Sequence, residues 1–254
     1  NLPLVGFQDF VAVLISGHQF LGRCSDQNKW LLPLISKILI KINPDFEALI
    51  RFSERINALE YDAVIATGSN NSARYFDYYF SKKPNIIRKN RTSVAVLTGE
   101  ENTSDLNALA KDICLYFGRG CRSISKLYLP KSMSVDLIFE ALFTEKQLIE
   151  NNKYANNYDY HRALYLMGQQ PFLDNGFMIL KEDEGLHSPI SVLYYNFYDS
   201  IQEVENQLNE LDSELQCTVS NHQILNSKTL GEAQHPKWQD YADNIDTIQF
   251  LTQL

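Results

Sequence analysis

Apolar and polar positions along this chain form short blocks that predict strands and helices in turn. Compact apolar runs typical of strands occur at 19–22, 61–67, 93–97, 126–130, 177–180, 191–197 and 217–220. Apolar residues recur at helical spacing in 27–42, 72–82, 104–117, 135–151 and 201–211, and Ser104 and Asp105 are suitable caps for the third of these helices. Because strands alternate with helices of this length, we predict an α/β architecture with largely parallel strand pairing.

The composition is that of a globular protein with a substantial core. The 254 residues are 44% hydrophobic and 21% charged, and the net charge is −8. This balance is typical of soluble chains, and no basic cluster suggests a nucleic-acid partner. The longest apolar runs, at 10–16 and 31–42, are shorter than the roughly 20 residues that span a bilayer. We therefore expect no membrane span.

The cysteines and the first residues indicate the compartment. Four cysteines, at 24, 114, 121 and 217, form no CxxC pair, so we expect a reduced cytoplasmic chain without structural zinc. The histidines lack metal-ligand spacing, so we expect no metal, and His18 and His187 are expected to be structural. The chain opens on Asn-Leu-Pro-Leu without Met, a basic segment or a cleavage site. We expect a fragment that carries no signal peptide.

Cys121 is the most reactive candidate. It lies in Phe-Gly-Arg-Gly-Cys-Arg-Ser at 117–123, between a predicted helix and a predicted strand. The two glycines permit a tight turn, and the charges of Arg119 and Arg122 favour a thiolate that attacks carbonyl carbon. A small buried cysteine at a crowded turn is the alternative interpretation. Cys114 and Cys217 fall within apolar helix and strand patterns and are expected in the core.

Two further turns are candidates for ligand binding. Thr67-Gly68-Ser69 follows an apolar strand and opens a helix, which makes an anion-binding helix N-terminus or an ordinary capped turn. Arg23, Ser25 and Asp26 follow the strand at 19–22 and suit an adenosine ribose with any 2′-phosphate, or a solvated turn. The peptide 153–160, rich in Tyr and Asn, fits a cleft lining or a surface loop.

Taken together, these segments resemble the aldehyde dehydrogenase superfamily, and most closely its acyl-CoA reductase branch of the bioluminescence type. Three segments carry the resemblance most clearly, namely ATGSNNSARYF at 66–76, IIRKNR at 86–91 and GRGCR at 118–122. The resemblance implies a Rossmann-type cofactor domain and an α/β catalytic domain. We expect a cofactor-binding domain at 1–97 with its N-terminal part missing, a catalytic domain at 98–225 and a C-terminal tail at 226–254.

The resemblance implies catalytic roles for two residues. Cys121 matches the nucleophile of the Gly-Gln-x-Cys motif, although Arg119 replaces the usual Gln. Asn1 matches the Asn of Asn-Phe-Pro-Leu, whose amide donates to the oxyanion together with the backbone N–H of the nucleophile. Both residues are therefore expected to stabilise an acyl-transfer transition state.

It also implies a nicotinamide cofactor. Arg23, Ser25 and Asp26 resemble Lys-Pro-Ser-Glu, whose Lys and Glu hold the adenosine ribose, and Arg with a shorter acid suits NADPH better than NADH. Thr67, Gly68 and Ser69 resemble the turn below the pyrophosphate, although Ala73 replaces the usual last glycine. Glu184, in Glu-Asp-Glu-Gly-Leu-His-Ser-Pro-Ile at 182–190, resembles the glutamate that touches the nicotinamide ribose.

One departure from the superfamily sharpens the expected reaction. Aldehyde-oxidising members carry Glu-Leu-Gly-Gly-Lys, whose Glu activates the deacylating water, where this chain has Arg-Lys-Asn-Arg-Thr at 88–92. An enzyme that takes its acyl group from CoA and reduces it needs no such base. We predict reduction of a fatty acyl-CoA to the aldehyde with NADPH, through a thioester on Cys121.

Two alternatives remain for the function. One is an acyl-phosphate reductase of the glutamyl-phosphate type, which shares the cysteine and the missing acid, and the other is a non-catalytic fragment. The family further implies a homo-oligomer and acyl-transferring partner enzymes.

Overall fold

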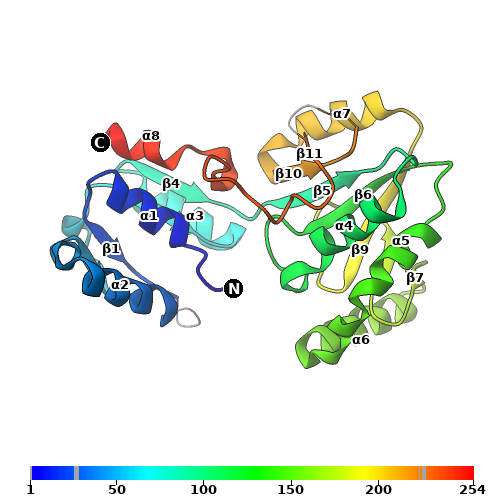
Figure 1. Cartoon of the computed structure of the whole chain (residues 1–254), viewed down its shortest axis with the longest axis horizontal. Helices are drawn as coiled ribbons and strands as arrows, with labels where there is room; N and C mark the ends of the chain where they lie inside the picture. Colours follow the sequence, from blue (N-terminus) through cyan, green and yellow to red (C-terminus); the bar gives the residue numbers. More distant parts are fainter. Residues whose placement is uncertain (1, 26–28, 223, 225–226) are drawn as a thin grey trace. The chain divides into compact units, whose positions relative to one another are not determined.

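A computed structural model describes residues 2–25, 29–222, 224 and 227–254 (Figure 1). The chain divides into two compact units. Unit 1 comprises Asn1–Asn90 and Gln239–Leu254, and unit 2 comprises Arg91–Trp238. The boundary between the units lies at residue 90, where the sequence predicted 97, and residues 239–254 belong to unit 1.

In its described residues, unit 1 contains two pairs of parallel strands. β1 (Phe20–Gly22) pairs with β2 (Ile50–Phe52), and β3 (Val64–Thr67) pairs with β4 (Asn85–Arg88). The helices are α1 (Phe7–Ile15), α2 (Leu31–Ile42), α3 (Asn70–Phe80) and α8 (Thr247–Thr252), with short 3₁₀ turns η1 (Pro44–Leu49), η2 (Ala58–Glu60) and η6 (Ala242–Asn244). The sequence pattern predicted β1, β3, α2 and α3 and missed β2 and β4.

Long-range polar contacts hold the C-terminal segment within unit 1. Arg88, at the end of β4, forms an ion pair with Asp9 of α1 at 2.5 Å and donates to Thr247 Oγ1 at 2.9 Å and to the carbonyl of Ala242 at 2.6 Å. His18 Nε2 donates to the carbonyl of Leu251 at 2.8 Å, which confirms the structural role expected for His18.

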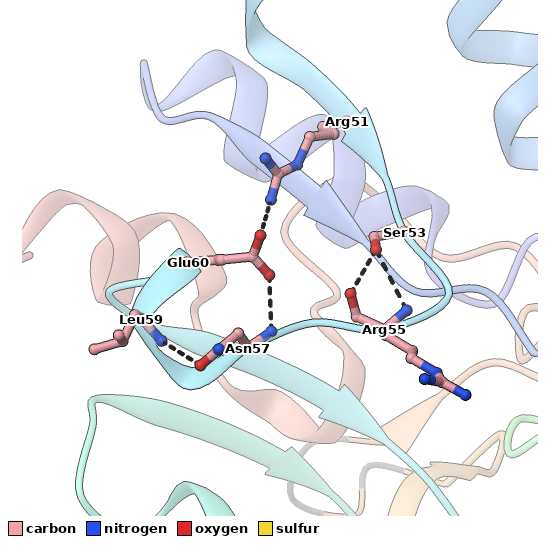
Figure 2. A network of polar contacts seen from close by, with 6 residues as sticks. All are labelled: Arg51, Ser53, Arg55, Asn57, Leu59 and Glu60. Carbon is pink, nitrogen blue, oxygen red and sulfur yellow. Dashed lines mark hydrogen bonds and ion pairs between the residues drawn. The ribbon is translucent and has the colours of Figure 1, made fainter.

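A local network shapes the connection that follows β2. Figure 2 shows Glu60 accepting from the Arg51 guanidinium at 2.8 Å and from the Asn57 backbone N–H at 2.7 Å, while Asn57 Oδ1 accepts from the Leu59 N–H. The backbone hydrogen bond from Asn57, followed by the contact with Arg51, lowers the pKa of Glu60. Asn57 and Glu60 therefore form a capping box that begins η2.

Unit 2 is built around a sheet with the order β11-β10-β5-β6-β9-β8-β7. All neighbouring pairs are parallel except β7 with β8. The strands are β5 (Thr92–Val96), β6 (Ile124–Pro130), β7 (Leu173–Asp174), β8 (Ile179–Glu182), β9 (Val192–Tyr198), β10 (Leu215–Val219) and β11 (Ser227–Lys228). The predicted α/β fold with largely parallel pairing is confirmed.

Helices cover both faces of this sheet (Figure 1). The helical elements are α4 (Thr103–Cys114), η3 (Leu115–Gly118), α5 (Asp136–Leu142), η4 (Phe143–Glu150), α6 (Asn152–Met167), α7 (Ile201–Glu210) and η5 (Asp212–Glu214). Ala95 and Leu97 pack with residues of α4 and α5 on one face, whereas Val94 and Val96 pack with α7 on the other. This alternation follows from the two-residue period of a strand.

The structure corrects three local predictions. α4 is capped by Asn102, and Asp105 instead completes a capping box from within the helix. The helix expected over 135–151 is divided into α5 and η4, with non-helical backbone at Glu145. The peptide 153–160 lies in α6, with Tyr154 and Tyr158 buried, so the loop interpretation was wrong. None of the helices in the described part of the chain has the length and apolar character that crossing a bilayer requires.

Candidate active site

Cys121 lies on a tight turn between η3 and β6. The Ser123 N–H donates to the carbonyl of Gly120 at 3.0 Å, and the Gly120 N–H donates to Ser123 Oγ at 3.1 Å. The Cys121 side chain is exposed, so the buried-cysteine interpretation does not describe this structure. Cys114 and Cys217 are buried, as expected, and burial raises the pKa of both thiols.

A strained stretch of backbone leads into this turn. Tyr116, Phe117 and Gly118 have φ values of 56°, 61° and 67°. Left-handed backbone costs a residue with a side chain roughly 1–2 kcal/mol, whereas glycine adopts it readily. Two consecutive aromatic residues in this conformation are therefore strained, and strain of this kind is concentrated at functional sites.

Ser93, in β5, contacts the turn that carries Cys121 from the sheet side. Its hydroxyl donates to the carbonyl of Cys121 at 2.8 Å and accepts from the backbone N–H of Cys217 at 3.2 Å. The strand register shifts on both sides of β5 at this level, because β6 and β10 each carry one extra residue, Ser125 and Gln216. Bulges of this type re-aim side chains and often lie beside active sites.

A second group of contacts reaches the turn from a segment near the C-terminal end of unit 2. Gln234 Nε2 donates to Ser123 Oγ and to the carbonyl of Asp112, both at 3.3 Å. The Gly231 N–H donates to Asp112 Oδ2 at 2.6 Å. Burial raises the pKa of Asp112 from 3.8 to about 6, although the hydrogen bond from Gly231 opposes this shift. The sequence analysis did not identify Ser93, Asp112 or Gln234.

A small pocket adjoins the turn that carries Cys121. Its wall includes Gly118 of that turn and the hydroxyl-bearing Ser125, Ser188 and Ser191. Most of the remaining lining is apolar and comes from Ile113, Phe117, Leu148, Tyr154, Met178 and Ile190. Polar and apolar atoms are exposed to this pocket about equally, and its volume of about 20 Å³ admits only a water-sized group.

Glu184 lies in the segment between β8 and β9. Its carboxylate accepts from Asn196 Nδ2 at 3.0 Å, and Lys126 donates to Asn196 Oδ1 and to the carbonyl of Asp183. The ammonium of Lys126 fixes which end of the Asn196 amide faces Glu184, because only the amide oxygen accepts. Lys126 is fully buried, and this burial lowers its pKa despite the nearby acids.

The remaining candidate residues belong to unit 1. Arg23 and Ser25 follow β1, Thr67 is the last residue of β3, and Ser69 lies two residues beyond it. All four are exposed. Asn1 and Asp26 lie outside the described residues. Arg23 and the exposed hydroxyls after parallel strands fit the phosphate groups of a nucleotide cofactor.

Local packing explains the glycine of the second turn. Ser69 caps α3 by accepting from the Ser72 N–H at 3.3 Å. A Cβ at Gly68 would lie 2.8 Å from Ser72 Cβ and 2.9 Å from a ring carbon of Phe76, so α3 itself requires glycine here. Ala73, where the superfamily has glycine, is fully buried. Across the described ranges, no three His, Cys, Asp or Glu residues gather where they would hold a metal ion.

Comparison with solved structures identifies the class of fold. Aldehyde dehydrogenase 21 of Physcomitrella patens, in complex with the product succinate, matches with a TM-score of 0.67 at 11% identity. The NAD⁺ complex of the Bacillus cereus aldehyde dehydrogenase matches with 0.65 at 12%, and substrate-bound Staphylococcus aureus AldH with 0.59 at 14%. The protein therefore has an aldehyde-dehydrogenase-like fold.

The matches cover most of this chain but only part of each of the larger proteins. The match with aldehyde dehydrogenase 21 covers 97% of this chain and 63% of that protein. The match with the Bacillus cereus enzyme covers 86% of this chain and 53% of that enzyme, and the match with AldH covers 86% and 56%. This chain thus spans little more than half the length of two of these structures. No protein-family pattern and no curated protein matches its sequence.

Proposed function

We propose that the protein is an NAD(P)H-dependent acyl-CoA reductase that forms the aldehyde through an acyl group carried on Cys121. The observation that carries this proposal is an exposed Cys121 on a hydrogen-bonded turn in an aldehyde-dehydrogenase-like fold. Arg119 and Arg122 flank the thiol in sequence, and their charge favours the thiolate form.

The chain's own residues account for the acyl transfer. The Cys121 thiolate attacks the thioester carbonyl, the bond from that carbon to the CoA sulfur breaks, and CoA leaves as a thiolate that takes a proton from water. Thioester exchange is close to balanced in energy, so the reaction needs a thiolate more than a strong base. Ser93 and Ser123 hold the turn that carries the sulfur, and a bound reduced nicotinamide supplies the hydride that releases the aldehyde.

The resemblance implies which residues would hold the cofactor. Arg23, Ser25 and Asp26 would hold the adenosine ribose, with Arg23 favouring the 2′-phosphate of NADPH. Thr67, Gly68 and Ser69 would lie below the pyrophosphate, and Glu184 would contact the nicotinamide ribose. The exposure of Arg23, Thr67 and Ser69 supports these roles.

One observation favours acyl transfer from CoA over aldehyde oxidation, in which water hydrolyses the acyl-enzyme. The segment 88–92 contains no acid that would activate water, and Arg88 at its start is engaged by Asp9 and Thr247. A homo-oligomer and acyl-transferring partner enzymes stay predictions, as does the cytoplasmic location.

Mass spectrometry of the intact chain tests the proposal. The chain is incubated with a long-chain acyl-CoA, with and without NADPH. One acyl group should map to Cys121 and should be lost as aldehyde when NADPH is added. Cys121→Ala should abolish the adduct, whereas Cys24→Ala, which removes a half-buried thiol in unit 1, should keep it. Equal labelling of Cys121→Ala would overturn the assignment, and labelling by an acyl phosphate alone would favour the acyl-phosphate alternative.

A further inference from the structure

We propose that the segment 230–235, here called the strap, positions the Cys121 turn, with Asp112 and Gln234 as its positioning residues. The inference rests on the proposed function in one respect, namely that Cys121 is the nucleophile. All of its parts belong to unit 2.

The strap is seated on α4 by a buried carboxylate. Asp112 is 1% exposed, and its Oδ2 accepts from the Gly231 N–H at 2.6 Å. Gly231 has a φ of +92°, and a Cβ on it would lie 2.9 Å from the Cβ of Ala108. Ala233 is fully buried. The strap therefore contacts the helix through its backbone, at a closeness that only glycine permits at position 231.

Packing alone does not explain why position 112 carries a carboxylate. Burying a carboxylate costs free energy unless partners compensate it, and an apolar side chain would fill the same place without that cost. Asp112 Oδ1 is buried without a hydrogen-bond partner. A buried charge that is only partly compensated is the kind of feature that persists where function requires it.

From α4 the strap continues to the nucleophile turn. The amide of Gln234 donates to the carbonyl of Asp112 and to Ser123 Oγ, both at 3.3 Å. Ser123 Oγ also accepts from the Gly120 N–H at 3.1 Å. The two lone pairs of this hydroxyl are thus both used, one by the strap and one by the residue that precedes Cys121.

Two further contacts place the turn between the strap and the sheet. Arg122 Nη1 donates to the carbonyl of Ala233 at 3.5 Å, and on the other side Ser93 donates to the carbonyl of Cys121 at 2.8 Å. A nucleophile held from both sides keeps its sulfur in an attacking geometry, and small misplacements of such a group are costly for rate. The strap would then act on reaction rate more than on substrate affinity.

Hydrogen exchange on the full chain tests the inference without any need for activity. Gln234→Ala and Asp112→Ala should speed exchange of the Gly120 and Ser123 amides by roughly three- to tenfold, the effect of losing one hydrogen bond. Asp112→Asn keeps an acceptor for Gly231 and should largely restore protection. Glu232→Gln, an exposed change on the strap itself, is the matched control and should leave exchange unchanged.

The kinetic arm separates positioning from general destabilisation. If acyl-CoA labels Cys121, Gln234→Ala should lower the labelling rate at saturating substrate about tenfold, as expected from loss of one positioning contact, with little change in half-saturation. Unchanged exchange at Gly120 and Ser123 in both Gln234→Ala and Asp112→Ala would overturn the inference, and so would a Glu232→Gln variant as disturbed as they are. Absence of labelling in the parent chain would contradict only the proposed reaction, because the exchange result stands without it.

Discussion

At the scale of single residues, Ser93 is the side chain whose contacts bear most directly on the proposed nucleophile. It is fully buried near the start of β5, where its hydroxyl links the Cys121 carbonyl to the backbone of Cys217. A buried polar group that loses its partner costs about 1–3 kcal/mol. Removing this hydroxyl would take one hydrogen-bond partner from each of two backbone groups, one of them the carbonyl of the proposed nucleophile.

Ser93→Ala is therefore expected to lower the free energy of unfolding by about 1–3 kcal/mol and to slow acylation of Cys121 by acyl-CoA. Ser104→Ala, an exposed change on α4, is the matched control and should alter neither quantity. Urea unfolding and time-resolved mass spectrometry measure the two effects. A Ser93→Ala protein that acylates at the parent rate would show that the sheet side of the turn does not position the thiol.

At the scale of elements, Arg88 joins parts of unit 1 that are far apart in the sequence. Its side chain is 4% exposed and binds α1 through Asp9 and the C-terminal segment through Ala242 and Thr247. Burial raises the pKa of Asp9, and the ion pair with Arg88 opposes that shift. Removing one partner of a buried pair is costly because the other charge remains in a poorly solvated place.

Arg88→Met should accordingly destabilise unit 1 by about 3–5 kcal/mol and increase hydrogen exchange in both α1 and α8. Lys89→Met provides the control, because Lys89 is 61% exposed and lies 3.7 Å from Asp77, a surface pair worth about 0–1 kcal/mol. Urea unfolding followed by circular dichroism reports the loss. Equal stability of the two variants would contradict the structural role assigned to Arg88.

The elements that the sequence predicted are those with strong apolar patterns. β5 is buried at every position, and α7 buries Val204 and Leu208 at a spacing of four. β2 has the exposed Arg51 at its centre, and β4 begins at Asn85 and ends at Arg88 with only two apolar residues between them, so neither forms a compact apolar run. α6 was missed because its buried residues, Tyr154, Tyr158 and Tyr165, carry polar hydroxyls and follow one another among Asn and Asp.

The candidate site shows the same division between local and distant information. The glycines and arginines around Cys121 predicted a turn from neighbouring residues alone. Ser93 contacts Cys217 and Gln234 contacts Asp112 across more than a hundred positions, and Ser93 reaches the Cys121 carbonyl across 28 positions. No local pattern encodes such pairs. An acid beside the apolar positions Leu109 and Ile113 of α4 was the one available signal for Asp112.

At the scale of the whole molecule, an aldehyde-dehydrogenase-like fold is retained at 11–14% identity to the structures compared. Fold depends on the order of strands and helices and on the alternation of buried positions, both of which tolerate exchange of one apolar side chain for another. Chemistry depends on single side chains, so the fold supports a reaction class only together with Cys121 and its turn. Buried charge also affects the stability of the whole unit, and Asp112 is the buried acid among the described residues of unit 2.

The stability of unit 2 should therefore depend on pH in a direction set by Asp112. Burial raises its pKa from 3.8 to about 6, with His235 the charged neighbour that opposes the shift. The native state thus holds this proton more tightly than the unfolded chain does. Between about pH 4 and pH 6 the free energy of unfolding should fall as pH rises, by about 3 kcal/mol in total, and the cost should persist above pH 6.

Asp112→Asn removes this titration and keeps an acceptor for the Gly231 N–H. The stability of the variant minus that of the parent chain should rise between pH 4 and pH 6 and stay level from there to pH 8. Asp105→Asn, an acid of the first turn of α4, is the control, and its difference should show no step near pH 6. Hydrogen bonds lower the pKa values of Asp174 and Asp183. Their contribution to the free energy of unfolding is therefore lost only at lower pH, and it is the same in the variant and in the parent chain. A difference for Asp112→Asn that stays flat across this range, in urea unfolding at fixed ionic strength, would show that the carboxylate is compensated in the native state and that the strap is held without a charge penalty.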